Sequence, residues 1–416
     1  MVSEQIPDGF RPIARCRVCE GSALFPVLDL GSQPLANAFV APTDPPPPHF
    51  PLAALGCAGC GTVQLSGTVD PHLMFDNYLY FSSYSSSMVT AMAELARQTA
   101  ARRDLRKGDL VVEVASNDGY LLRHYEEMGM RTLGVEPAAN VAAVAIDEGI
   151  DTRVAYFTAD YARELRSEGL APKVIHANNV IAHVPAIHDF VEGLRVLLAD
   201  DGVVVLETPS LVDLLDQLLF DTIYHEHVFY WSLGALAELF GRHGLVLEEC
   251  EHVARHGGSL RATWRHRRGP GDEGSGSSPL LAESALRLTS PASYASFAAD
   301  TARSGEALRT AFTSIRAAGR SLAGYGAAAK ATVLLNYAGI GSDVLDFVVD
   351  LNPAKQGRVV PGVGVPIVSL EVLKERRPDV LAVFTWNIAA EVRAQLQWYA
   401  TGGGELLDPL SLRSRR

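Results

Sequence analysis

The sequence lacks several features that would mark a particular class of protein. Five cysteines in 416 residues are too few for a disulfide-built scaffold. No uncharged apolar run reaches the roughly 18 residues of a membrane span, and the first residues lack the basic and apolar regions of a secretory signal. Basic residues are outnumbered, with 36 Lys and Arg against 48 Asp and Glu, so polyanions are poor partners. We therefore expect a cytoplasmic monomer that binds neither nucleic acid nor membranes.

The composition is that of an ordinary globular protein. Hydrophobic residues make up 48% of the chain and charged residues 20%, with a mean hydropathy of +0.09. The length suggests about three domains. We place them at 1–75, 76–268 and 269–416, as a small metal-binding module followed by two Rossmann-like α/β domains.

Four of the five cysteines form two Cys-x-x-Cys pairs with 37 residues between them. Two such pairs can supply the four thiolates of a tetrahedral structural Zn²⁺ site. The alternative is a pair of redox motifs or free thiols. The predicted zinc ligands are Cys16, Cys19, Cys57 and Cys60.

Residues 71–88 are rich in aromatic and hydroxyl side chains. The pattern alternates poorly for a strand, and its serines weaken a helix prediction. It fits either a packed loop or a lid that faces a substrate. A lid would place four side chains against the substrate: Tyr80, Phe81, Ser83 and Tyr84.

From Gly108 the chain alternates strand and helix patterns, which predicts a parallel doubly wound sheet with its ligand at the carboxyl ends of the strands. The first turn, residues 113–119, resembles motif I of Rossmann-like S-adenosylmethionine (AdoMet) methyltransferases, although Ala115 and Asn117 replace two of its glycines. Glu136 ends the next strand and can accept hydrogen bonds from ribose hydroxyls. AdoMet is favoured over NAD(P) and over a sheet without a ligand. The predicted cofactor residues are Glu113, Ser116, Asn117, Asp118, Gly119, Glu136, Asn178 and Asn179.

The segment 220–232, FDTIYHEHVFYWS, gathers histidines, a glutamate and aromatic residues directly after a predicted strand. His225 and His227 could bind a metal if the segment is extended. A histidine here could equally act as a general base beside a carboxylate and a phenol. His183 follows another strand, so the fold could bring it to the same cleft; its alternative role is a cap near Pro185. Tyr230 is a further candidate substrate contact.

The last block contains a second glycine turn, Gly324-x-Gly326-x-x-Ala329, between a strand pattern and a helix pattern. Asp350 ends the following strand, where a ribose-binding acid is expected. Lys330 stands at the start of the helix, where it could hold phosphate. The motif fits NAD(P) and also a nucleotide-diphosphate substrate.

The order of these motifs along the whole chain resembles the zinc-containing dTDP-sugar C-3 methyltransferases of deoxysugar antibiotic biosynthesis, the group that makes tetronitrose, kijanose or mycarose. Five motifs carry the resemblance: the four cysteines, YFSSYS, EVASNDGYLL, YHEHVFYWS and GYGAAAKA. The resemblance implies AdoMet-dependent methylation, with inversion, at C3 of a dTDP-4-keto-6-deoxyhexose, which can be 2-deoxy and is expected to carry a 3-amino group.

The resemblance also implies roles for particular residues. Glu226 and His227 match the catalytic pair of the family, with Tyr224 just before them, and His183 and Tyr78 match further polar residues of its active site. The C-terminal domain would hold the nucleotide sugar through Lys330, and zinc would be structural. The chemistry is consistent, because the C3 proton beside a C4 ketone is mildly acidic and a neutral His227, oriented or charge-stabilised by Glu226, could remove it.

Two other functions compete with this one. A nicotinamide-dependent oxidoreductase acting on a nucleotide sugar would depend on Gly324, Gly326 and Asp350. A zinc-bearing binding protein without catalysis would need none of the histidines.

Overall fold

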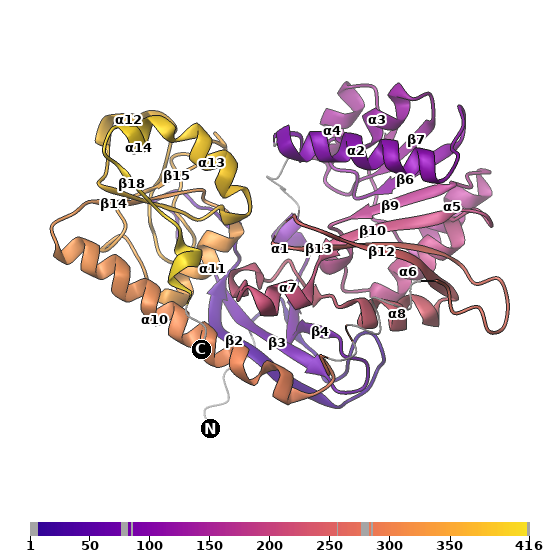
Figure 1. The fold of residues 1–416 in the computed structure, drawn as a ribbon, viewed down its shortest axis with the longest axis horizontal. Coiled ribbons are helices and arrows are strands. Elements are labelled where there is room, and N and C mark those ends of the chain that lie inside the picture. The colour runs from indigo at the N-terminus through magenta and orange to yellow at the C-terminus, as the bar shows by residue number, and fades with distance from the viewer. Residues whose placement is uncertain are drawn as a thin grey trace.

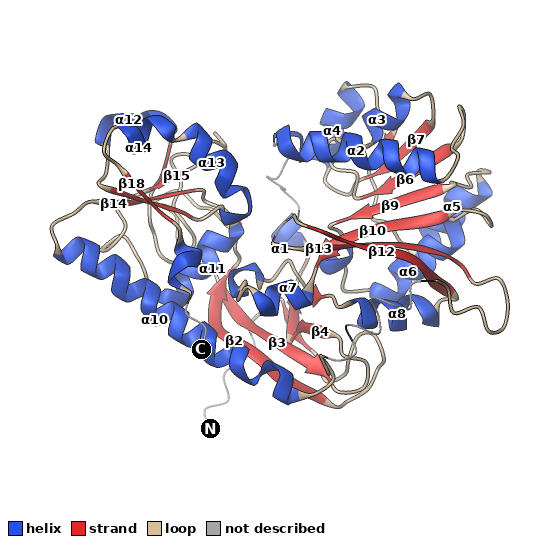
Figure 2. Cartoon of the chain, viewed as in Figure 1, coloured by secondary structure: helices blue, strands red, loops and turns tan. Residues whose placement is uncertain are grey.

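The computed structural model describes residues 7–75, 82–84, 86–255, 257–275, 283 and 286–413. The chain is built from helices and strands mixed along its length, so the α/β prediction is confirmed (Figures 1 and 2). A mostly parallel sheet and an entirely parallel one, each with helices, lie at opposite ends of the molecule, and a smaller antiparallel sheet lies between and below them. None of the described helices is both long and apolar enough to cross a lipid bilayer.

The central sheet has seven strands, and β13 runs in the direction opposite to the others, so its pairs with β12 and β10 are antiparallel. Alternate residues of a strand face opposite sides: Val111 packs towards α2 and α3, whereas Val112 packs towards α5, α6 and α8. Its strands are, in spatial order, β12 (Leu245–Val253), β13 (Ser259–His266), β10 (Val203–Pro209), β9 (Val174–Asn178), β6 (Leu110–Val114), β7 (Arg131–Val135) and β8 (Thr152–Arg153). Its helices are α2 (Ser86–Arg102), α3 (Leu122–Glu127), α4 (Ala139–Asp147), α5 (Ala159–Ser167), α6 (Ile187–Leu197) and α8 (Leu233–Arg242).

The N-terminal sheet is completed by a strand from the middle of the chain. It runs β11-β4-β3-β2, and all its pairs are antiparallel. The strand β11 comes from residues that the predicted boundaries assign to the second domain. The elements of this region are β1 (Phe10–Pro12), β2 (Leu24–Pro34), β3 (His49–Cys57), β4 (Val63–Leu65), β5 (Gly67–Val69), α1 (His72–Phe75) and β11 (Phe229–Tyr230).

The C-terminal sheet is entirely parallel, in the order β16-β15-β14-β17-β18. Its long helix α10 reaches across to β2, so that one hydrophobic core joins this domain to the N-terminal sheet and to α7 (Figure 1). The elements are α7 (Leu211–Asp216), α10 (Ala295–Ala317), β14 (Leu322–Tyr325), α11 (Ala329–Ala338), β15 (Val348–Val349), β16 (Ile367–Val368), α12 (Leu370–Arg376), β17 (Val380–Val383), α13 (Ala389–Gln395), α14 (Gln397–Thr401) and β18 (Glu405–Leu407).

Candidate active site

The turn after β6 has the backbone of a glycine-rich loop although it contains one glycine. Ala115, Asn117 and Gly119 have φ values of 55°, 51° and 75°, all in the left-handed region. Asn tolerates this conformation, and alanine pays a moderate steric cost for it. The turn therefore keeps the shape of motif I with residues that a glycine pattern would not detect.

A carboxylate and a neighbouring segment hold this turn in place. Glu136 accepts hydrogen bonds from the backbone N–H groups of Asn117 (3.0 Å) and Ala138 (2.9 Å). The backbone N–H of Ser82 donates to Asn117 Oδ1 (2.8 Å), and that of Ser83 donates to Asp118 Oδ2 (3.0 Å). The candidate lid thus contacts the motif I turn.

Of the aromatic candidates in that segment, Tyr84 closes the short 3₁₀ helix η1 (Ser82–Tyr84). Tyr78, Tyr80 and Phe81 lie outside the residues that the structure describes.

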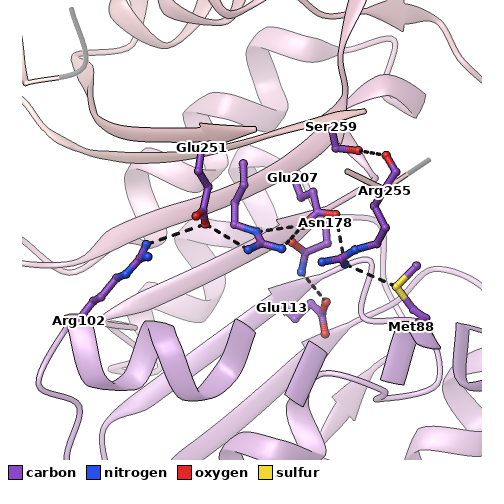
Figure 3. Close-up of polar contacts among 9 residues, drawn as sticks. Met88, Arg102, Glu113, Asn178, Glu207, Glu251, Arg255 and Ser259 are labelled. Atoms are coloured by element: carbon purple, nitrogen blue, oxygen red, sulfur yellow. Dashed lines mark hydrogen bonds and ion pairs between the residues drawn. The ribbon is translucent and has the colours of Figure 1, made fainter. Parts of the chain in front are cut away.

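Several buried oxygen atoms of this turn, of Glu113 before it and of the end of β9 have no hydrogen-bond partner among the described residues. Burial raises the pKa of Glu113 well above its usual value, and the charges of Glu136 and Asp118 add to this, although Asn178 Nδ2 donates to Glu113 Oε1 (3.2 Å; Figure 3). Such acceptors fit a cationic ligand that carries ammonium and hydroxyl donors, and AdoMet is a ligand of this kind. The atoms are Glu113 Oε2, Ser116 Oγ, Asp118 Oδ1, Asn178 Oδ1 and Asn179 Oδ1.

A network that the sequence did not reveal lies beside Glu113 and Asn178 (Figure 3). Glu207 on β10 is fully buried and pairs with Arg261 (2.7 Å) and Arg255 (3.4 Å). Arg255 stands near the tip of the β12–β13 hairpin and also donates to Met88 Sδ (3.9 Å). Glu207 and Arg261 are direct cross-strand partners, so only the antiparallel register could have predicted their pairing.

The histidine-rich segment holds the imidazole of His227 in one tautomer. Its Nδ1 lies 3.0 Å from the carbonyl oxygen of Thr222, which can only accept a hydrogen bond. Nδ1 therefore carries the proton of the neutral ring, and Nε2 accepts from the Tyr224 hydroxyl at 2.9 Å. The orientation that we expected from Glu226 comes from Thr222 and Tyr224, because the Glu226 carboxyl turns towards another partner.

That partner belongs to the N-terminal region. Asn37 Nδ2 donates to Glu226 Oε1 at 2.7 Å. Burial raises the pKa of Glu226 to about 7, while the hydrogen bond from Asn37 and the charge of Lys355 oppose the rise. A carboxyl group in this state exchanges protons near neutral pH, as a catalytic acid or base must.

His183 is brought to the same place by the short 3₁₀ helix η2 (Ile181–His183) after β9. Its ring lies edge-on to that of His227, with centroids 4.8 Å apart. Burial lowers the pKa of His183 to about 4, so the ring is neutral at pH 7. His225 is buried against Phe50, and the metal alternative for His225 and His227 finds no support, since the four cysteines are the only metal-compatible cluster in the described ranges.

The glycine turn of the C-terminal domain is held by hydrogen bonds to Asp350 and Lys355. Asp350 Oδ2 accepts from the backbone N–H of Ala327 (2.8 Å), and Lys355 donates to the carbonyl of Ala327 (2.9 Å). Asp350 also accepts from the backbone of Asn352 (2.8 Å). Asp350 thus holds its turn in the same way as Glu136 holds the motif I turn, so these hydrogen bonds do not decide between NAD(P) and a nucleotide-diphosphate substrate.

Lys330 lies at the start of α11, with Nζ 5.4 Å from the centroid of the Trp386 ring. Burial lowers its pKa and the nearby Lys355 adds to this, while Asp221 opposes it. Tyr230, in contrast, packs in the hydrophobic core within β11. Sequence reasoning missed Asn37 and Trp386, because nothing in their local sequence distinguishes them.

The four predicted zinc ligands come together. Their Sγ atoms all lie within 4.8 Å of one another, with Cys16–Cys60 at 3.6 Å and Cys19–Cys57 at 3.4 Å. Zn–S bonds of about 2.3 Å in a tetrahedron require sulfur atoms roughly 3.8 Å apart. The thiol set therefore fits a closed structural Zn²⁺ site.

Family models match three successive parts of the chain. Residues 16–75 match the model described as "Putative zinc binding domain", residues 85–249 the "Methyltransferase domain", and residues 254–410 the "C-methyltransferase C-terminal domain". The chain is 34% identical over 406 residues to the C-methyltransferase NovU of Streptomyces niveus, covering 97% of both chains.

Solved structures resemble part of the chain. A SAM-dependent methyltransferase from Anabaena variabilis ATCC 29413 is 16% identical, with 41% of this chain and 83% of that chain covered and a TM-score of 0.35. Magnesium protoporphyrin IX methyltransferase from Synechocystis PCC 6803 is 12% identical, with 42% and 79% covered and a TM-score of 0.33.

Proposed function

The chain belongs to the C-methyltransferases that combine a zinc module with an AdoMet-dependent methyltransferase domain, and from this premise we propose that it methylates C3 of a dTDP-linked 4-keto-6-deoxyhexose. One observation carries the proposal. The Nε2 lone pair of His227, the Tyr224 hydroxyl and the Glu226 carboxyl belong to one short segment beside the carboxyl edge of the central sheet. This set can remove a proton next to a ketone and support the resulting enolate. The proposed location is the cytoplasm, where the thiols stay reduced.

His227 is the proposed base. The bond from Nδ1–H to Thr222 O fixes the tautomer in which Nε2 is the basic atom. The C3 proton is acidic because its loss places negative charge on the C4 oxygen. Removal of the proton by Nε2 generates the enolate and an imidazolium ion.

The enolate oxygen needs hydrogen-bond donors, and the site has two candidates. The Tyr224 hydroxyl stands 2.9 Å from Nε2 and can turn to the C4 oxygen once a sugar enters. His183 is neutral, so it can donate without the repulsion that a second imidazolium beside His227 would create. Glu226 supplies the negative charge that stabilises the imidazolium through space.

AdoMet, when bound, supplies the methyl group that C3 takes. Glu113, Asp118 and Asn178 are the proposed partners of its ammonium group and its methionyl end, because their oxygen atoms are buried without donors. Glu136 is the proposed ribose contact. It already holds the motif I turn, but each carboxylate oxygen keeps a further lone pair for a hydroxyl donor.

Lys330 is the proposed contact for the diphosphate of the nucleotide sugar. Its ammonium group has no ion-pair partner within the described ranges and faces Trp386 across 5.4 Å. A partly buried cation of this kind gains from an anionic ligand. Lys355 is already paired with Asp350 at 3.7 Å, so Lys330 supplies the local positive charge in a chain whose net charge is −12.

Deuterium exchange at C3 of dTDP-4-keto sugars, in D₂O and without AdoMet, tests the proposal. The wild-type protein should exchange this proton, and His227→Asn should slow the exchange at least a hundredfold, in the range of a lost general base. His252→Asn, an exposed histidine on β12, is the matched control and should exchange at the wild-type rate. Full exchange by His227→Asn would exclude His227 as the base, and no exchange by the wild type would exclude the substrate class.

A further inference from the structure

A short segment of the N-terminal region reaches into the candidate active site. We name residues 35–40, which follow β2, the strap. Its Asn37 side chain donates to Glu226 Oε1 at 2.7 Å, across 189 residues of sequence. The Glu226 carboxyl is buried, so this hydrogen bond is a strong, charge-assisted one whenever Glu226 is ionised.

The C-terminal domain holds the strap from the other side. The Thr332 hydroxyl on α11 donates to the carbonyl of Ala36 (2.9 Å), within a buried contact. Arg358 donates to the carbonyl of Phe39 (2.9 Å), and Lys355 lies 5.1 Å from the centroid of the Phe39 ring. These contacts fix the backbone on both sides of Asn37, so the position of its amide is set by tertiary structure.

Charged and titratable groups from several elements lie near Glu226. Lys355 approaches from the C-terminal domain, and the ring of His183 interacts with the Glu226 backbone. His225 and His227 flank it in the segment itself. Among these groups, Asn37 is the hydrogen-bond donor to the carboxyl, and Lys355 is the cation that acts on it through space.

We propose that Asn37 is a positioning residue for the methyl-transfer reaction, because its amide fixes the Glu226 carboxyl group and stabilises the carboxylate form. The proposal rests on the proposed function for its link to catalysis. It gives the zinc module a direct part in the active site, since the strap continues from the sheet that carries Cys57. Without the amide, burial alone would favour the neutral acid, and the imidazolium of His227 would lose its nearby negative charge.

The test is a pH titration of the Glu226 carboxyl group in the full-length, zinc-loaded protein without substrate. NMR of ¹³C-carboxyl-labelled glutamate monitors the titration. Glu226→Gln identifies the signal by its disappearance. Asn37→Leu keeps the size of the side chain and removes the donor. We expect the midpoint to rise by about 1 to 2 pH units, the range of a lost hydrogen bond to a charged group. Asn37→Asp, which adds a like charge, should raise it at least as far.

Asn140→Leu, on the exposed start of α4, is the matched control and should leave the midpoint unchanged. The acidic limb of the kcat profile reports a group that must be deprotonated, so it should move to higher pH with the titration in Asn37→Leu, with kcat at pH 7 falling about tenfold and the KM for AdoMet unchanged. A merely structural role would lower kcat without moving either the limb or the midpoint. A folded Asn37→Leu or Asn37→Asp protein that titrates like the wild type would overturn the proposal.

The titration needs no sugar, so its outcome is separate from that of the proposed function. If the midpoint moves while no dTDP-4-keto sugar exchanges or is methylated, the proposed substrate falls and the Asn37–Glu226 link stands. If the sugar is methylated and the midpoint does not move, the proposed function stands and the role of Asn37 is wrong.

Discussion

A buried ion pair between the central and C-terminal domains offers a quantitative test of how the site is assembled. Asp221 lies in the 3₁₀ helix η3 (Phe220–Thr222), three residues before Tyr224 of the proposed catalytic set. Its Oδ1 lies 2.8 Å from the guanidinium of Arg413, and its Oδ2 accepts from Trp386 Nε1 at 2.7 Å. The side chains of Asp221 and Arg413 are 1% and 6% exposed, so neither charge can turn to water.

We predict that Asp221→Asn destabilises the protein by about 3–5 kcal/mol, the cost of leaving one charge of a buried pair without its partner. Arg413 keeps its bond to the carbonyl of Leu218 (2.6 Å) and its contact with the Phe220 ring, but neither neutralises the guanidinium. For a unit of 150–250 residues this corresponds to a fall in Tm of roughly 6–20 °C. Arg413→Met should cost a similar amount, because it leaves the buried carboxylate with one neutral donor.

The double variant distinguishes an ion pair from two independent packing sites. Each single substitution leaves the partner's charge buried and unpaired, and the double variant removes both charges. The destabilisation of the double variant should therefore be smaller than the sum of the two single values by more than about 2 kcal/mol. Urea unfolding followed by circular dichroism measures all four proteins, with Asp160→Asn, an exposed acid paired to Arg163 on α5, as a control that should leave the midpoint in place. A loss below about 1 kcal/mol in Asp221→Asn, or strict additivity in the double variant, would refute this account of domain docking.

Three further predictions follow from the site. Cys57→Ser removes one of four sulfur ligands, so metal analysis should find less than the roughly one zinc per chain of the wild type, together with a lower Tm. The pKa of Glu226 is about 7 in the folded protein against 4.5 for the free side chain. Its contribution to the free energy of unfolding is therefore complete below pH 4.5 and is lost as the pH rises through 7. From pH 5 to pH 8, chemical unfolding should show that the wild type loses about 2–3 kcal/mol of stability relative to Glu226→Gln. Ala115→Gly should raise stability by up to about 1 kcal/mol in the same assay, because glycine adopts the φ of 55° without steric cost.

Local patterns were sufficient for the parts of this structure that depend on neighbours in sequence. The alternation of strand and helix signals predicted the Rossmann-like sheet, and two short cysteine pairs predicted the sulfur cluster, which the structure forms with Sγ atoms within 4.8 Å. The motif I turn was recognisable despite its missing glycines, because Asn117 and Ala115 can adopt the backbone that glycine normally supplies.

The remaining features depend on which distant residues the fold brings together. The pairing of Glu207 with Arg261 follows from the register of β10 against β13, which no strand pattern reveals. The role expected of Glu226 assumed that sequence neighbours interact. The backbone of 220–227 instead brings the Thr222 carbonyl to the imidazole of His227 and sends Glu226 towards Asn37. A hydrogen bond to a backbone carbonyl cannot be predicted from residue types, because every residue has such a carbonyl group.

The segment 220–232 explains why the chain needs all three parts. Asp221 pairs with Arg413 and Trp386 of the C-terminal domain, Glu226 meets Asn37 of the N-terminal region, and β11 completes the N-terminal sheet by pairing with β4. These contacts restrict the backbone conformation of the segment between them. That conformation places the Thr222 carbonyl beside His227 and so fixes the tautomer of its ring. The precision of the proposed base thus comes from contacts on either side of it along the chain, made to two different domains. An isolated methyltransferase domain would keep the motif I turn and its bonds to Glu136 but would lose Asn37, β4 and Arg413 at once, so we expect it to lose the proposed proton chemistry.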